Sequence, residues 1–126
     1  MARLGDTFRL RGLDDHLIII ISEPARGPER IVTANFTSWR PDKDQSCLVE
    51  AGEHSFVKKR SCVEYRRDKL MTLSQYDAHM ASGRLTAHDP VSQALLNRIL
   101  RGAAKSPYIP LGNRQILVDQ GLIDDP

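Results

Sequence analysis

Short runs in which apolar and polar residues alternate fill the first half of the chain, and this pattern is typical of β-strands. In residues 5–10, Phe8 and Leu10 alternate with polar residues, which predicts a half-exposed strand. Residues 17–21 are consecutive branched apolar residues between turn-forming segments. They predict a short central strand that is buried on both faces. Further strands are expected at 31–36, 46–50, 56–57 and 62–65.

The period of the pattern changes beyond residue 70. A helix is expected from Thr72 or Ser74 to Ala81, because either hydroxyl is a good N-cap. Asp89 followed by Pro90 predicts the start of a second helix. Apolar residues then recur every four positions and form one stripe: Val91, Leu95, Ile99 and Ala103. A third helix is expected near 113–120.

Strands that come first and helices that come last predict an α+β fold with an antiparallel sheet. About five strands with short connections suit a small β-barrel, so we expect an SH3-like barrel over 1–70. The helical extension over 71–126 would pack on it, within a single domain of 126 residues. The apolar stripe of the second helix is expected on the barrel. The alternative is an interface with a second copy or another protein.

Composition is that of an ordinary soluble protein, with 40% apolar and 27% charged residues. A net charge of +2 is too small to indicate a nucleic-acid partner by itself. We see neither a signal peptide nor an apolar run long enough for a bilayer, so a cytoplasmic location and no membrane partner are expected.

Cys47 and Cys62 are expected to be buried, reduced thiols on neighbouring strands rather than a disulfide. The four histidines lack the spacing of metal ligands. The sequence therefore predicts neither a metal site nor a cofactor.

Two hydroxyls, the single tryptophan and an arginine follow the strand at 31–36: Thr37, Ser38, Trp39 and Arg40. Hydroxyls at a strand end can hold a phosphate oxygen, and arginine can pair with the same group. Trp39 would then stack on an unpaired base. The alternative is structural: Thr37 and Ser38 satisfy turn amides, and Trp39 closes the edge of the core.

His16 stands at the start of the apolar strand, after Asp14 and Asp15. A histidine titrates near neutral pH and a carboxylate can orient it, so His16 is a candidate general base. The alternative is a solvated histidine in a turn.

Basic residues gather around an apolar segment and a tyrosine: Lys58, Lys59, Arg60, Tyr65, Arg66 and Arg67. Such a stripe suits a polyanion, with Tyr65 as a stacking surface. The alternative is an edge strand protected by charge.

The strand order resembles that of the MazF/PemK family of bacterial toxins. The first strand opens with Gly5-Asp6, an apolar strand from Leu17 to Ser22 follows, and the next strand ends in Thr37-Ser38. His16-Leu17 stands where the family has an Arg-Pro pair. The resemblance implies an SH3-like barrel followed by helices.

The resemblance also implies a metal-independent endoribonuclease, a hydrolase in the broad sense, that belongs to a toxin–antitoxin pair. In such a reaction the RNA 2′-hydroxyl attacks its own phosphate and leaves a cyclic phosphate. His16 would be the base or the acid, Arg40 or Arg66 the cation, and Thr37 and Ser38 the hydroxyls that hold the phosphate. Single-stranded RNA, an antitoxin protein and a second copy of the chain would be the partners.

The sequence leaves two other functions open. The first is a non-catalytic SH3-like module that binds protein or nucleic acid through Trp39, Tyr65 and the basic stripe. The second is an accessory protein of a phage or mobile element that keeps the fold without the activity. The position of His16 separates the enzyme from the binding module, because an enzyme needs His16 near Thr37 and a binding module does not.

Overall fold

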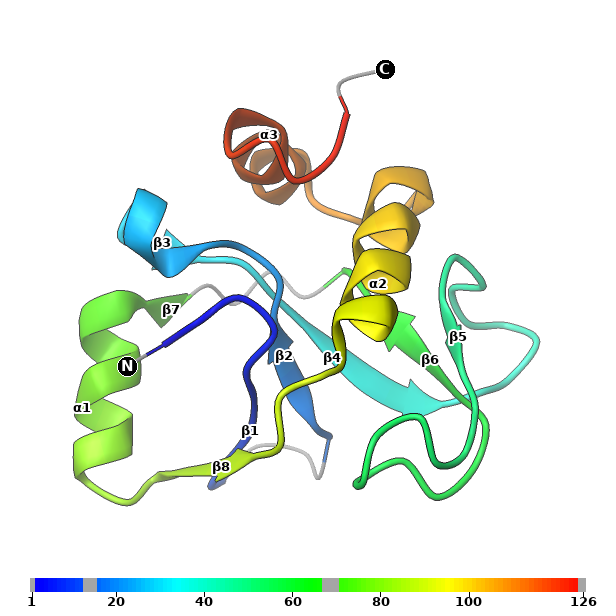
Figure 1. Cartoon of the computed structure of the whole chain (residues 1–126), viewed down its shortest axis with the longest axis horizontal. Coiled ribbons are helices and arrows are strands. Elements are labelled where there is room, and N and C mark those ends of the chain that lie inside the picture. The colour runs from blue at the N-terminus through cyan, green and yellow to red at the C-terminus, as the bar shows by residue number, and fades with distance from the viewer. Residues whose placement is uncertain (1, 13–15, 67–70, 125–126) are drawn as a thin grey trace.

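The computed structural model describes residues 2–12, 16–66 and 71–124, and it has an α+β fold (Figure 1). A sheet of six antiparallel strands has the order β5-β6-β4-β2-β1-β8, and a smaller sheet pairs β3 with β7. The strands are β1 (Thr7–Leu10), β2 (Ile18–Ile20), β3 (Arg30–Ile31), β4 (Thr33–Ser38), β5 (Leu48–Val49), β6 (Ser61–Glu64), β7 (Met71–Thr72) and β8 (Leu85–His88). The helices are a short 3-10 turn, η1 (Pro24–Arg26), and α1 (Leu73–Ala81), α2 (Gln93–Lys105) and α3 (Leu111–Asp119).

Within the described ranges the large sheet is open, so the expected closed barrel is not confirmed. Its edges are β5 and β8, which do not pair with each other there. The sheet also extends past residue 70, because β8 pairs with β1 from Thr7 opposite His88 to Leu10 opposite Leu85. The segment 56–57, expected to be a strand, lies instead in the connection between β5 and β6.

The central strand β2 is buried on both faces, as predicted. Leu17, Ile19 and Ile21 belong to one apolar core, whereas Ile18 and Ile20 belong to another. Successive side chains of a strand point to opposite faces, so a sheet covered on both sides requires an uninterrupted apolar strand.

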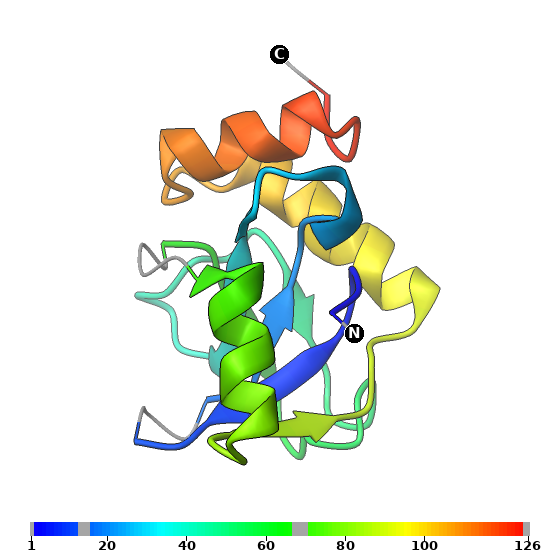
Figure 2. The same cartoon turned by 90° about the vertical axis from the view of Figure 1, so that its left-hand side faces the viewer.

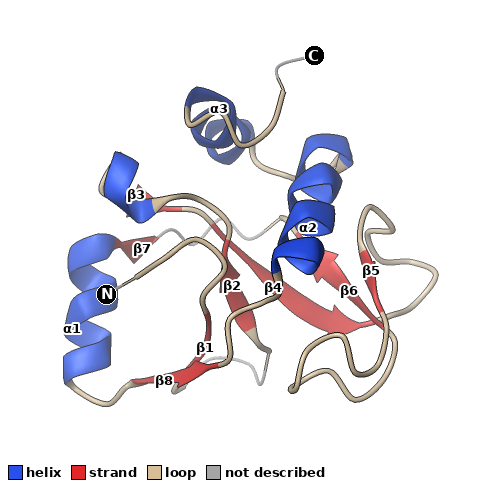
Figure 3. Cartoon of the chain, viewed as in Figure 1, coloured by secondary structure: helices blue, strands red, loops and turns tan. Residues whose placement is uncertain are grey.

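Helix α2 covers one face of the sheet, and α3, at the top of Figures 1 and 3, adds Ile116 and Leu117 to the same core. Leu95, Ile99 and Ala103 of α2 are buried in the same core as Phe36 of β4. The predicted apolar stripe therefore packs on the sheet, and these three side chains are unavailable to a partner protein.

Helix α1 covers the other face, and Figure 2 shows it in front of the sheet. Its Tyr76 ring meets the Phe8 ring of β1 edge to face, with centroids 5.5 Å apart. The predicted start of this helix is confirmed: the Thr72 hydroxyl accepts the Gln75 amide hydrogen at 3.1 Å, and the Gln75 side chain accepts the Thr72 amide hydrogen.

Helix α2 begins later than predicted, at Gln93, and Ser92 is its N-cap. Asp89 is not the cap because its polar groups are used elsewhere. Its carboxylate accepts a hydrogen bond from the Ser55 hydroxyl at 2.7 Å, and its carbonyl accepts one from the Thr7 hydroxyl. None of the described helices combines the length and the apolar character that a membrane-spanning segment needs.

Cys47 and Cys62 are free and buried, as expected. Leu48 lies opposite Cys62 in the sheet, so Cys47 lies one step away from Cys62 in the register. Because neighbouring positions of a strand point to opposite faces, the two thiols lie on different faces of the sheet.

Candidate functional site

Polar residues from three segments meet at one end of the large sheet. Antiparallel pairing brings the start of β2, the end of β4 and the start of β6 to this end. The Phe36 amide donates to the Leu17 carbonyl at 2.9 Å, so the pairing continues past Ile18. His16 comes directly before Leu17 and Thr37 directly after Phe36, so both residues lie at this end of the sheet.

A pocket of about 270 Å³ opens at this end of the sheet. Its polar lining consists of His16, Thr37, Ser38, Lys58, Lys59 and Ser61. Its apolar lining consists of Leu17, Phe36, Phe56 and Val57. Three of the residues predicted to be catalytic are thus brought together with two lysines of the predicted basic stripe.

Lys43 is a further cation that contacts Thr37, although it is not among the residues that line the pocket. Its ammonium group donates a hydrogen bond to the Thr37 hydroxyl oxygen at 2.5 Å, and Thr37 is buried. A hydroxyl that accepts in this way keeps its own proton as a donor. Sequence reasoning missed Lys43, because it lies in a charged loop without periodicity and nothing in that loop marks which residue turns back to β4.

The loop that carries Lys43 is held by Trp39. The indole N–H of Trp39 donates to the Gln45 side-chain oxygen at 2.7 Å, and the Gln45 amide donates to the Lys43 carbonyl at 2.6 Å. Farther along the loop, buried Asp44 accepts a hydrogen bond from the Ser106 hydroxyl at 2.5 Å. Trp39 therefore organises the loop that carries Lys43 to Thr37.

Arg40 does not join the pocket. Its side chain is 66% exposed and forms an ion pair with Asp42 at 3.6 Å. Strand β4 ends at Ser38, and the turn that follows directs Arg40 to the surface. The predicted grouping of Arg40 with His16 and Thr37 is therefore wrong, and Lys43 holds the position beside the Thr37 hydroxyl.

Tyr65 is not a stacking surface. It is only 1% exposed, and its hydroxyl donates to the Ile99 carbonyl of α2 at 2.6 Å. Desolvation on burial raises the pKa of this phenol. The prediction is corrected because Tyr65 points into the core, where its ring packs beneath α2.

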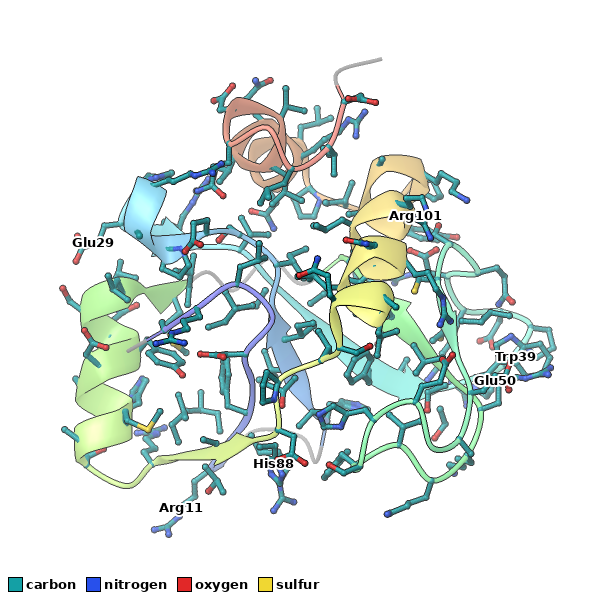
Figure 4. All side chains as sticks on the ribbon, in the orientation of Figure 1. Arg11, Glu29, Trp39, Glu50, His88 and Arg101 are labelled. Carbon is teal, nitrogen blue, oxygen red and sulfur yellow. The ribbon has the colours of Figure 1, made fainter. Side chains whose placement is uncertain are left out.

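The expected basic stripe divides into separate groups. Lys58 and Lys59 line the pocket. Arg60 pairs with Glu50 at 3.0 Å, and its guanidinium lies 5.8 Å from the Trp39 ring centre; Figure 4 shows Glu50 and Trp39 at the same margin of the molecule. Arg66 follows the opposite end of β6, where its guanidinium lies 4.7 Å from the Tyr108 ring centre. Arg67, like Asp14 and Asp15, lies outside the described residues.

His54 anchors the loop that forms one wall of the pocket. Its Nε2 donates to the Asp89 carbonyl at 2.5 Å, since a carbonyl oxygen can only accept. Its Nδ1 accepts the Phe56 amide hydrogen at 3.0 Å. Both ring nitrogens are used in hydrogen bonds, so buried His54 fixes the backbone at Phe56.

The Phe56 ring also packs against two side chains that do not line the pocket. The His88 ring meets it edge to face with centroids 5.3 Å apart, and the Arg9 guanidinium lies 5.6 Å from its centre. Arg9 Nε donates to His88 Nε2 at 3.2 Å. Burial lowers the pKa of His88, and the charge of Arg9 lowers it further. Both effects favour the neutral form of the ring.

The pocket combines an imidazole, hydroxyls and ammonium groups, which suits anion binding together with proton transfer. Among the described residues, no three His, Cys, Asp or Glu side chains are grouped to hold a metal ion. Comparison of the chain with family models, with curated proteins and with solved structures found no match. Any function is therefore inferred from the geometry of this pocket.

Proposed function

We propose that this protein is a metal-independent endoribonuclease that cleaves single-stranded RNA in the pocket at the end of β4. The observation that carries the proposal is that His16 and Thr37 line one pocket, which Lys58 and Lys59 also line. Juxtaposition of His16 and Thr37 is what an enzyme requires and a binding module does not. The burial of Tyr65 also removes a surface on which the binding function depended.

In the proposed reaction, neutral His16 takes the proton of a 2′-hydroxyl. The 2′-oxygen forms a bond to the adjacent phosphorus, and the bond from phosphorus to the 5′-oxygen breaks. The departing 5′-oxygen takes a proton from a lysine ammonium group at the pocket. The products are a 2′,3′-cyclic phosphate and a 5′-hydroxyl, so this step consumes no water.

In the proposed reaction, the cations stabilise the negative charge of the phosphorane. Fixed positive groups that face a developing oxyanion lower the barrier to its formation. Lys58 and Lys59 line the pocket, and Lys43 contacts the Thr37 hydroxyl. In this role the three lysines replace Arg40 and Arg66, and Ser38 and Thr37 orient the phosphate.

Cleavage of a single-stranded RNA by the purified protein in EDTA tests the proposal. We expect cleavage by the wild type and a loss of at least about tenfold in His16→Ala, since general bases contribute about 10²–10⁴ in rate. His79→Ala, on helix α1 outside the pocket lining, is the matched control and should cleave normally. RNA that stays intact after long incubation with pure, folded protein would refute the proposal.

We further propose that the protein acts as the toxin of a toxin–antitoxin pair, in line with the resemblance of its sequence to the MazF/PemK toxins. Induced expression in bacteria should then arrest growth, and His16→Ala should relieve the arrest. Equal arrest by wild type and His16→Ala, at equal protein levels, would show that toxicity does not arise from cleavage.

A further inference from the structure

One part of the pocket lining is apolar and consists of Leu17, Phe36, Phe56 and Val57. Resting on the proposed function, we propose that it binds the unpaired nucleobase next to the cleaved phosphate, with Phe56 as the stacking ring. The proton transfers and the phosphate contacts of the cleavage reaction do not use this part of the pocket.

The lining separates into an apolar floor and a cationic rim. Leu17, Phe36 and Val57 are 0%, 4% and 4% exposed, so they form a closed floor. Phe56 is only half-buried. A phosphate alone would lose hydration against such a floor without gaining hydrogen bonds. The lining therefore fits a group with one flat, weakly polar part and one anionic part.

Phe56 is held in place before any ligand arrives. Its amide is fixed by His54, and its ring is braced by His88 and by the Arg9 guanidinium. A ring that is already ordered loses little conformational entropy when a base stacks on it. Stacking on an aromatic side chain contributes about 1–3 kcal/mol per base.

The order of residues along the loop links the base to the phosphate. Phe56 and Val57 are followed directly by Lys58 and Lys59, and all four line the same pocket. One short segment thus supplies both the stacking ring and the cations, which suits the base and phosphate of a single nucleotide. A pocket of about 270 Å³ has room for one such unit, and a base stacked within a duplex would not be free to enter it.

Isothermal titration calorimetry with nucleoside 3′-monophosphates and with ribose 3-phosphate tests this proposal. We expect the nucleotides to bind at least about fivefold more tightly than the sugar phosphate, as the lower end of the stacking range implies. Phe56→Ala and Phe56→Leu should remove that difference and leave ribose 3-phosphate binding unchanged. Tyr108→Ala, which alters a 46% exposed ring outside the pocket lining, is the matched control and should bind like the wild type.

Equal affinity for nucleotides and ribose 3-phosphate would overturn the base site, as would full nucleotide affinity in a folded Phe56→Leu protein. RNA cleavage by a wild-type protein that shows no preference for the nucleotides would reject the base site and retain the endoribonuclease. Phe56-dependent nucleotide binding by a protein that leaves RNA intact would support the base site and reject the endoribonuclease.

Discussion

Lys43 donates a hydrogen bond to the Thr37 hydroxyl at 2.5 Å, which joins the loop after β4 to the buried end of that strand. The bond places an ammonium group beside a residue of the pocket. In the proposed reaction, Thr37 and Lys43 act as one unit on the phosphate.

Removal of the Lys43 charge should therefore slow RNA cleavage. Lys43→Met should lower kcat at least about tenfold, since the loss of one stabilising group at a developing oxyanion costs about 10²–10³ in well-studied enzymes. Arg40→Met is the matched control: it removes a neighbouring cation that does not line the pocket, and its kcat should stay within about twofold. Equal losses in the two variants would indicate a general effect of net charge.

The effects of Thr37→Val and Lys43→Met on the rate of RNA cleavage should be non-additive. If the two side chains act through one hydrogen bond, the double variant should be little worse than the poorer single variant. Steady-state cleavage rates of the four proteins give the coupling directly. Fully additive losses would show that the hydrogen bond has no part in the reaction.

The close packing of Tyr65 against α2 should leave no room for a larger side chain at Gly102. A Cβ at Gly102 would overlap the Tyr65 hydroxyl and lie 2.8 Å from the Cys47 Cβ. Gly102→Ala should therefore destabilise the protein by about 1–3 kcal/mol in urea unfolding, despite the better helix propensity of alanine. Gly112→Ala in α3, where the nearest atom would be 3.5 Å away, should be neutral or stabilising. A stable Gly102→Ala protein would contradict the close packing.

The two thiols should be unreactive in the folded protein. Burial raises the pKa of Cys62 to about 11 and also raises the pKa of Cys47, so little reactive thiolate exists at neutral pH. A chromogenic disulfide reagent should label neither thiol quickly in buffer and both in urea. Rapid labelling of native protein would show that these strands open.

Stability should fall as the pH drops through the histidine range. The pKa of His88 is lowered in the folded state, so the unfolded chain takes up the proton first. His88 therefore contributes stability above the unfolded pKa, about 6.5, and this contribution is lost as the pH falls through the lower folded pKa. Urea unfolding between pH 7.5 and pH 5 should show a shallower decline in His88→Gln than in the wild type, and parallel declines would contradict this reason.

Local signals in the sequence were sufficient for the central strand and for the start of α1. A short, uninterrupted apolar run between turns is typical of a strand that is covered on both faces. The capping box at Thr72 is formed by residues that are close together in the chain, so it can be predicted locally. The position of His16 and Thr37 at the same end of the sheet was also predictable, because antiparallel order brings those strand ends together.

Contacts between distant segments were not predictable. Asp89 looks like a helix cap, but its groups bind Ser55 and Thr7, which are far away in the sequence. Tyr65 follows a basic run yet faces α2, and Lys43 reaches Thr37 because the loop turns back. In each case a tertiary contact decides between local alternatives that the sequence leaves equal.

Activation of an RNA 2′-hydroxyl by His16 is the step on which the proposed function depends. The most direct measurement uses an oligonucleotide that the wild type cleaves at one phosphodiester, together with the same oligonucleotide bearing a 2′-O-methyl group at that nucleotide, both in EDTA. We expect a 2′,3′-cyclic phosphate and a 5′-hydroxyl from the first substrate and no cleavage of the second at that position. Cleavage of the methylated substrate at the same phosphodiester would contradict activation of the 2′-hydroxyl.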